Sequence, residues 1–157
     1  MSRVHPSSVL LAGLLLAAQP ACTVAPPAGA TSAPADLAGG YEAFHALVRE
    51  WATAVADDAV DRALGLYTPD ARLKLDYLAQ GPELREAMAE WFPGVRSVVI
   101  GPADYDISGN LAYGVVRVLV VPADGGRRRA GIMTVIARWT TGRWLIRAQY
   151  LGVAPLA

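Results

Sequence analysis

The stretch that decides the fold is Ala63–Tyr77, with the sequence ALGLYTPDARLKLDY. Its first residues end a short amphipathic helix that the apolar spacing predicts over residues 59–67. The segment Thr68-Pro69-Asp70 then predicts a turn. Apolar and polar residues alternate over residues 71–78, which predicts a strand with one wet face. The inward row of this strand is expected to be Leu73, Leu75 and Tyr77, so its carboxylate, Asp76, is expected on the opposite face.

The residues on either side of this stretch predict two more helices. The first helix is expected to begin at Leu37 or Tyr41 and to end at Ala56. Its apolar side chains share one face at helical spacing: Tyr41, Phe44, Leu47, Val48, Trp51 and Val55. The later helix is expected to start at Gly81-Pro82, because proline is tolerated at a first helical position, and to stop at Pro93-Gly94.

The second half of the chain predicts four strands, expected over residues 95–100, 111–121, 129–139 and 143–151. The connections carry hairpin residues at Ser108-Gly109-Asn110, Asp124-Gly125-Gly126 and Thr140-Thr141-Gly142. Helices that precede consecutive strands indicate an α+β domain with a mostly antiparallel sheet. Both faces of 111–121 are largely apolar, so we expect the face without helices to be covered by a second subunit, as a homodimer.

The N-terminal residues predict export from the cytoplasm. Arg3 precedes an apolar run over residues 9–18, which is the layout of a signal peptide over residues 1–22. Cys22 follows this run and is the expected lipidation site if the signal is of the lipoprotein type, whereas cleavage within Ala28–Ala30 is the competing possibility. Residues 23–38 are rich in Pro and Ala and predict a flexible tether, and residues 39–154 form the domain. The expected location is the periplasm or cell envelope, with a possible membrane tether through Cys22.

Composition excludes several classes of function. The 14 acidic and 14 basic residues balance, so no general attraction to nucleic acid is expected. The basic run at residues 127–129 is expected to be a solvated hairpin edge. One histidine in the domain, His45, and one cysteine that precedes the domain, Cys22, do not make a metal or redox site, and we expect no metal and no cofactor.

The order of these segments resembles the nuclear transport factor 2-like superfamily, which includes SnoaL-like polyketide cyclases and ketosteroid isomerases. The matching pieces are VREWATAVADDAVDRALGLYTPDARL (48–73), GPELREAMAEWF (81–92), GNLAYGVVRV (109–118) and TTGRWLIRAQYLG (140–152). The resemblance implies a cone-shaped domain, in which about three N-terminal helices pack on a curved sheet. It also implies an apolar pocket inside the cone and a common tendency to dimerise.

The same resemblance implies catalytic positions that this sequence fills with other residues. The isomerase base falls on Leu75, the tyrosine of the first helix falls on Trp51, and the second acidic donor falls near Val135. Histidines that relatives carry in the closing strand are replaced by Ala148 and Tyr150. These replacements favour a protein without isomerase activity.

The remaining candidates leave three hypotheses open. The first is a non-catalytic domain that binds a small apolar molecule or a protein, with Trp51, Tyr67, Tyr77 and Trp91 as expected ligand contacts. The second is a SnoaL-like enzyme, cyclase or isomerase, that uses Asp76 or His45 as an acid-base residue. The third is a structural module that dimerises through the apolar sheet face. Arg117 and Arg138 interrupt apolar strands, and each is either exposed or inward and paired with an anion.

Overall fold

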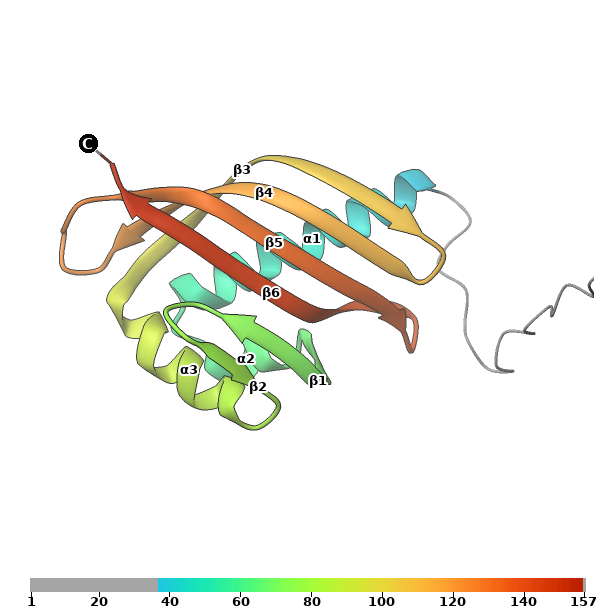
Figure 1. The fold of residues 1–157 in the computed structure, drawn as a ribbon, viewed down its shortest axis with the longest axis horizontal. Coiled ribbons are helices and arrows are strands. Elements are labelled where there is room, and N and C mark those ends of the chain that lie inside the picture. Colours follow the sequence, from blue (N-terminus) through green and yellow to red (C-terminus); the bar gives the residue numbers. More distant parts are fainter. Residues whose placement is uncertain (1–36, 157) are drawn as a thin grey trace, which may run out of the picture.

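The computed structural model describes residues 37–156, which form three α-helices and six strands (Figure 1). The predicted signal peptide, nearly all of the tether and Cys22 lie outside the described residues. Among the residues that are described, no helix is both long and apolar enough to cross a membrane.

Two of the helices precede the first strand and the third follows the second strand, and the helices lie on one side of the sheet (Figure 1). They are α1 (Leu37–Ala56), α2 (Val60–Leu64) and α3 (Glu83–Trp91), and a short 3-10 helix, η1 (Phe92–Gly94), follows α3. Helix α1 buries most of the predicted apolar face, including Phe44, Val48 and Trp51, and packs mainly on β3. Tyr41, which the spacing predicts on the same face, is 36% exposed. The predicted long first helix is therefore confirmed, whereas α2 is shorter than expected.

Six strands make one sheet in the order β2-β1-β6-β5-β4-β3. The strands are β1 (Tyr67–Lys74), β2 (Leu78–Gln80), β3 (Val95–Ser108), β4 (Leu111–Pro122), β5 (Arg129–Thr140) and β6 (Arg143–Pro155). All neighbours are antiparallel except β1 and β6, which run parallel. The α+β prediction and the mostly antiparallel sheet are confirmed. We call the face toward the helices the inner face and the opposite one the outer face.

The space between the helices and the inner face is filled by side chains. Its fully buried members are large and mostly apolar: Phe44, Val48, Trp51, Val55, Leu73, Met88, Phe92, Val116, Val120, Met133 and Ile146, together with Gln149. Burial at this density is the main source of the domain's stability.

The corner that decides the fold differs from its prediction in three ways. The prediction of a turn at Thr68-Pro69-Asp70 is wrong, because β1 begins at Tyr67 and includes these three residues. The pairing of β1 with β6 shifts its register between Tyr67 and Arg72. The strand expected over 71–78 ends at Lys74, and the chain then bends back into β2. Leu73 and Leu75 are buried as predicted, but Tyr77 is 45% exposed. The alternation fails there because Tyr77 lies in the bend, where the backbone N–H of Leu75 donates to the carbonyl of Tyr77 (3.3 Å).

Candidate functional site

The interior of the cone contains a small group of buried polar atoms, which we call the interior polar cluster: Trp51, Tyr67, Met133 and Gln149. The Tyr67 hydroxyl donates to Gln149 Oε1 (2.5 Å), and Gln149 Nε2 donates to Met133 Sδ (3.0 Å). The indole N–H of Trp51 is close enough to the Tyr67 hydroxyl to affect its pKa, but it lacks hydrogen-bond geometry and has no partner. The cluster therefore joins α1, β1, β5 and β6 at the centre of the fold.

The electrostatics of this cluster favour uncharged groups. Burial raises the pKa of the Tyr67 phenol well above its usual value of 10, and the nearby Trp51 N–H opposes that shift only in part. Tyr67 is therefore neutral at physiological pH. In the described part of the chain, Thr68 and Gln149 are the buried side chains of polar type. The interior can donate and accept hydrogen bonds, but it offers neither a carboxylate nor an imidazole.

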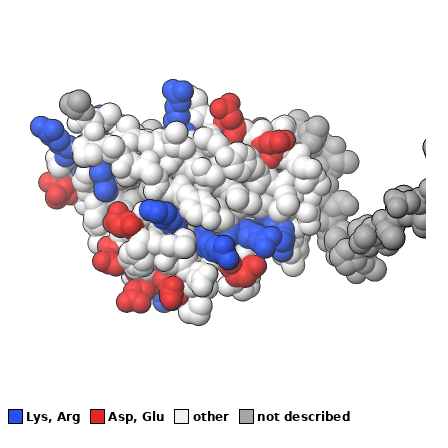
Figure 2. Space-filling view, in the orientation of Figure 1, with Lys and Arg blue, Asp and Glu red and all other residues white. Residues whose placement is uncertain are grey.

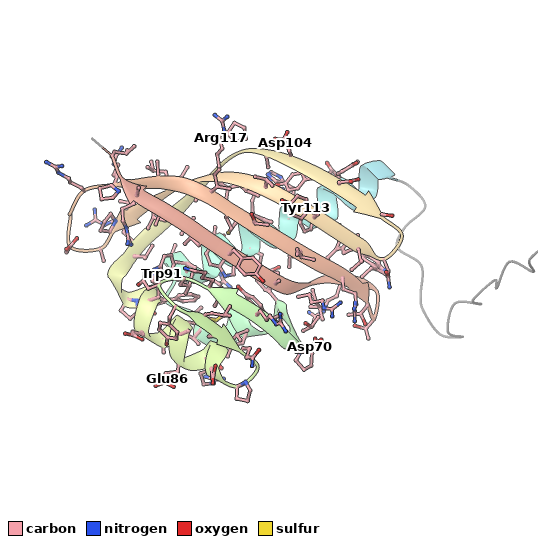
Figure 3. The ribbon with its side chains drawn as sticks, viewed as in Figure 1. Asp70, Glu86, Trp91, Asp104, Tyr113 and Arg117 are labelled. Atoms are coloured by element: carbon pink, nitrogen blue, oxygen red, sulfur yellow. The ribbon has the colours of Figure 1, made fainter. Side chains whose placement is uncertain are left out.

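A pocket of about 240 Å³ opens where α3 ends, next to the bend after β1. We call it the mouth pocket, and its lining is Leu75, Asp76, Tyr77, Ala87, Glu90, Trp91, Gly94, Val95 and Arg129. Trp91 is 8% exposed and stacks on Trp51, with ring centroids 6.4 Å apart and planes at 26°. The indole of Trp91, which Figure 3 labels on α3, thus lies between the mouth pocket and the interior.

Charged groups of both signs surround the mouth pocket. The Tyr77 hydroxyl donates to Glu90 Oε2 (3.2 Å), and its pKa is raised first by desolvation and then by this carboxylate. Across the pocket, the Nε of Arg129 is buried and has no hydrogen-bond partner. Within the described residues, no ion pair joins Arg129 to Asp76 or Glu90. The pocket therefore combines apolar side chains with the unpaired Nε of Arg129 and with the carboxylates of Asp76 and Glu90, of which Glu90 already accepts the Tyr77 hydroxyl.

The structure separates the residues that the sequence proposed for chemistry. Asp76 is exposed and lines the mouth pocket. His45 is half-buried on α1, edge-on to Tyr105 with centroids 5.8 Å apart, and the lining of the mouth pocket does not include it. The structure therefore does not bring Asp76 and His45 together in one site, as an enzyme that uses both would require.

The four proposed ligand contacts fall into two groups. Trp51 and Tyr67 belong to the interior polar cluster, and Tyr77 and Trp91 line the mouth pocket. Sequence reasoning missed Gln149, which faces inward because a bulge in β6, at the shift opposite Ile136 and Ala137, turns Arg147 outward. The sequence of residues 147–150 (RAQY) contains no residue that predicts this bulge.

A larger hollow of about 890 Å³ lies on the outer face and is called the outer hollow here. Its floor includes Leu111, Ile136, Ala148 and Tyr150, and its charged side chains are Asp70, Arg72, Glu83 and Arg147. The pKa of Asp70 is lowered first by the nearby Thr68 side chain and further by the positive charges of Arg147 and Arg138. Arg117 is exposed and Arg138 is half-buried on this same face, so neither enters the cone.

No group of three or more His, Cys, Asp or Glu residues that could hold a metal ion occurs within residues 37–156.

Solved structures show what this architecture is similar to. A protein of unknown function from Mycobacterium tuberculosis superposes with a TM-score of 0.69 at 21% identity, over 79% of this chain and 78% of that one. A designed protein of the nuclear transport factor 2 type gives 0.65 at 14% identity, over 72% and 99%. A type 2 hexachlorocyclohexane dehydrochlorinase gives 0.62 at 18% identity, over 78% and 92%. Neither a family model nor a curated protein matches the sequence.

These likenesses define the class of fold. The helices, the curved open sheet and the strand order are those of the nuclear transport factor 2-like fold, as the sequence resemblance implied. Because the similar structures include an enzyme and a protein of unknown function, the fold alone assigns no activity.

Proposed function

We propose that this domain binds a small molecule at the mouth pocket and does not transform it. The observation that supports the proposal best is the chemistry of the interior polar cluster, whose phenol, indole and amide are all uncharged. The mouth pocket supplies an apolar surface from Leu75, Trp91 and Val95. A fitting ligand has an apolar body and a polar substituent that meets Arg129 or Glu90.

Catalysis by proton transfer would need a base and stabilising donors that converge on one substrate. The positions where relatives hold such groups are occupied here by Leu75, Trp51 and Val135, which are all buried. Asp76 points to the exposed rim of the mouth pocket, where water competes for its carboxylate. Binding without turnover is therefore the function that this geometry supports best.

A titration with 2-naphthol tests the proposal, because this probe is apolar, uncharged at neutral pH and small. Trp91 lines the pocket, so we expect saturable quenching of tryptophan fluorescence in the unmodified protein. Gly94 also lines the pocket, and a side chain added there would meet no atom within 4 Å. Gly94→Leu is therefore expected to occupy the pocket and to weaken binding at least tenfold, with little change in the melting temperature.

The control for this experiment is the interior. Tyr67→Phe removes a hydroxyl that the probe does not reach, so its affinity for 2-naphthol is expected to match that of the unmodified chain. Equal affinity in Gly94→Leu and the unmodified protein would place the ligand elsewhere and contradict the proposal. Release of chloride from hexachlorocyclohexane that depends on Asp76 would instead support the enzyme alternative.

A further inference from the structure

The outer hollow lies where two neighbouring strands depart from regular pairing. In β6 the bulge places Arg147 on the outer face, and in β1 the register against β6 shifts between Tyr67 and Arg72. Bulges are common next to binding sites, because they redirect a side chain that a regular strand would point elsewhere. Both irregularities border the same hollow of about 890 Å³, which the cone interior and the mouth pocket do not use.

Two arginines line this hollow and a third borders it, each from a different strand. Arg72 on β1 is the cross-strand partner of Ala148. Arg147 directly precedes Ala148 on β6. Arg138 on β5 is the partner of Leu111, and both Leu111 and Ala148 form part of the floor. Neighbouring strands are about 4.8 Å apart, so the long side chains of the three arginines reach the same end of the hollow.

The carboxylates of the protein neutralise these arginines only in part. The Nε of Arg147 lies 4.0 Å from Oδ2 of Asp70, in a loose and exposed ion pair. Within the described residues, neither Arg72 nor Arg138 forms an ion pair. Exposed ion pairs stabilise a fold very little. Three guanidinium groups around one carboxylate are therefore better explained by an external anion than by a contribution to stability.

The basic groups border an apolar surface. Figure 2 shows blue side chains that gather over β1 and β6, next to a broad white area that continues over β5 and β4. In the floor of the hollow, Leu111 is 42% exposed, Tyr150 is 37% exposed and Ile136 is half-buried. A flat apolar molecule placed on these side chains removes apolar surface from water on both partners.

We propose that the outer hollow binds a small organic carboxylate with a flat apolar body. The carboxylate meets Arg72 and Arg147, since a guanidinium group binds a carboxylate through two parallel N–H···O bonds. The body lies on the apolar floor. Asp70 and Glu83 line the same hollow and repel additional negative charge, so a monoanion fits better than a dianion.

This site is independent of the mouth pocket. Among the described residues, the linings of the two have no member in common. The mouth pocket opens next to the bend after β1, whereas the outer hollow lies on the opposite face of the sheet from the helices. A ligand in one site therefore leaves the other accessible.

Calorimetric titration of the full chain with 2-naphthoate tests the proposal. Two further probes each lack one half of this molecule: 2-naphthamide keeps the ring and loses the charge, and acetate keeps the carboxylate and loses the ring. We expect 2-naphthoate to bind at least tenfold more tightly than either, because the site recognises both halves. Equal affinity for 2-naphthoate and 2-naphthamide would show that the arginines hold no anion and would overturn the proposal.

Substitution of the arginines locates the anion. Arg72→Gln and Arg147→Gln are each expected to weaken 2-naphthoate binding at least fivefold and to leave 2-naphthamide binding unchanged. Arg117→Gln is the matched control, because Arg117 is also exposed on the outer face but pairs with Ile132, outside the lining of the hollow. Its affinity for 2-naphthoate is expected to equal that of the unmodified chain. Circular dichroism and the melting temperature verify that each variant is folded.

Gly94→Leu separates this site from the mouth pocket and is expected to leave 2-naphthoate binding unchanged. Loss of 2-naphthoate binding in Gly94→Leu, with normal affinity in Arg72→Gln and Arg147→Gln, would place the anion at the mouth pocket and overturn the outer site. Absence of saturable 2-naphthoate binding, or equal weakening by Arg117→Gln and Arg72→Gln, would also contradict it. Neither of these last results bears on 2-naphthol at the mouth pocket, so the two proposals fail separately.

Discussion

Trp51→Ala is expected to lower the free energy of unfolding by about 3–5 kcal/mol, measured by urea denaturation. The side chain is fully buried, stacks on Trp91 and approaches the Tyr67 hydroxyl. Its removal leaves a cavity at the centre of the fold, surrounded by groups from α1, α3 and β1, and such a core cannot collapse to fill it. The same change opens the interior beneath Trp91.

Trp51→Phe is the matched control. It keeps an aromatic ring against Trp91 and removes the indole N–H that has no hydrogen-bond partner. The loss of stability is expected to be well below that of the alanine variant, since a buried unpaired donor contributes nothing favourable. A cost of less than about 1 kcal/mol for Trp51→Ala would show that this position lines an open cavity rather than a packed core.

Gly131→Ala is expected to destabilise the domain by about 3 kcal/mol or more, because a Cβ at this position would collide with the backbone of β6. The atoms it would meet are the carbonyl of Gly152 and Cα of Val153, neither of which is the movable end of a side chain. The pairing of β5 with β6 must shift to admit even one methyl group.

Gly152→Ala provides the comparison on the facing strand. A Cβ there would come no closer than 3.9 Å to the carbonyl of Ile132, so little or no loss of stability is expected. Both variants are measured by thermal and urea denaturation of the same preparation. If Gly131→Ala and Gly152→Ala cost the same, the close approach of β5 and β6 at this point is contradicted.

The order of the elements could be predicted because it rests on strong local patterns. The apolar face of α1 repeats at helical spacing from Tyr41 to Val55, and the glycine-containing turns after β3, β4 and β5 fix where each hairpin reverses. These signals are sufficient to predict an α+β fold and the class of protein it resembles. Trp51 and Leu75 could also be placed on inward rows from the apolar spacing, and both are buried, as is Val135.

The corner and the site were less predictable because they depend on tertiary contacts. Pro69 suggested a turn, but the backbone there is held against β6 as a strand with a register shift. Tyr77 followed the alternation in the sequence, yet the bend after Lys74 turns it toward Glu90. Arg129 lies in a basic run that predicts a hairpin edge, and only the fold shows that its Nε faces the mouth pocket without a partner.

The cone interior is a packed, uncharged core, and we propose that ligands bind the domain at its mouth. Tyr67 tests this most directly, because it is the titratable side chain of the interior polar cluster. Its pKa in the folded state lies above the unfolded value of 10, so the stability it contributes is full below about pH 10 and falls as pH rises toward the folded-state pKa. In this range the free energy of unfolding falls by about 1.4 kcal/mol per pH unit for one such group.

The measurement is an ultraviolet titration of tyrosinate in the unmodified protein and in Tyr67→Phe, combined with urea denaturation between pH 9 and 12, the range that brackets the tyrosine pKa. We expect that Tyr67 does not ionise until the protein unfolds, and that the alkaline loss of stability is smaller in Tyr67→Phe. Ionisation of Tyr67 in the folded protein at or below pH 10 would contradict it, because water or a charged partner would then reach the interior.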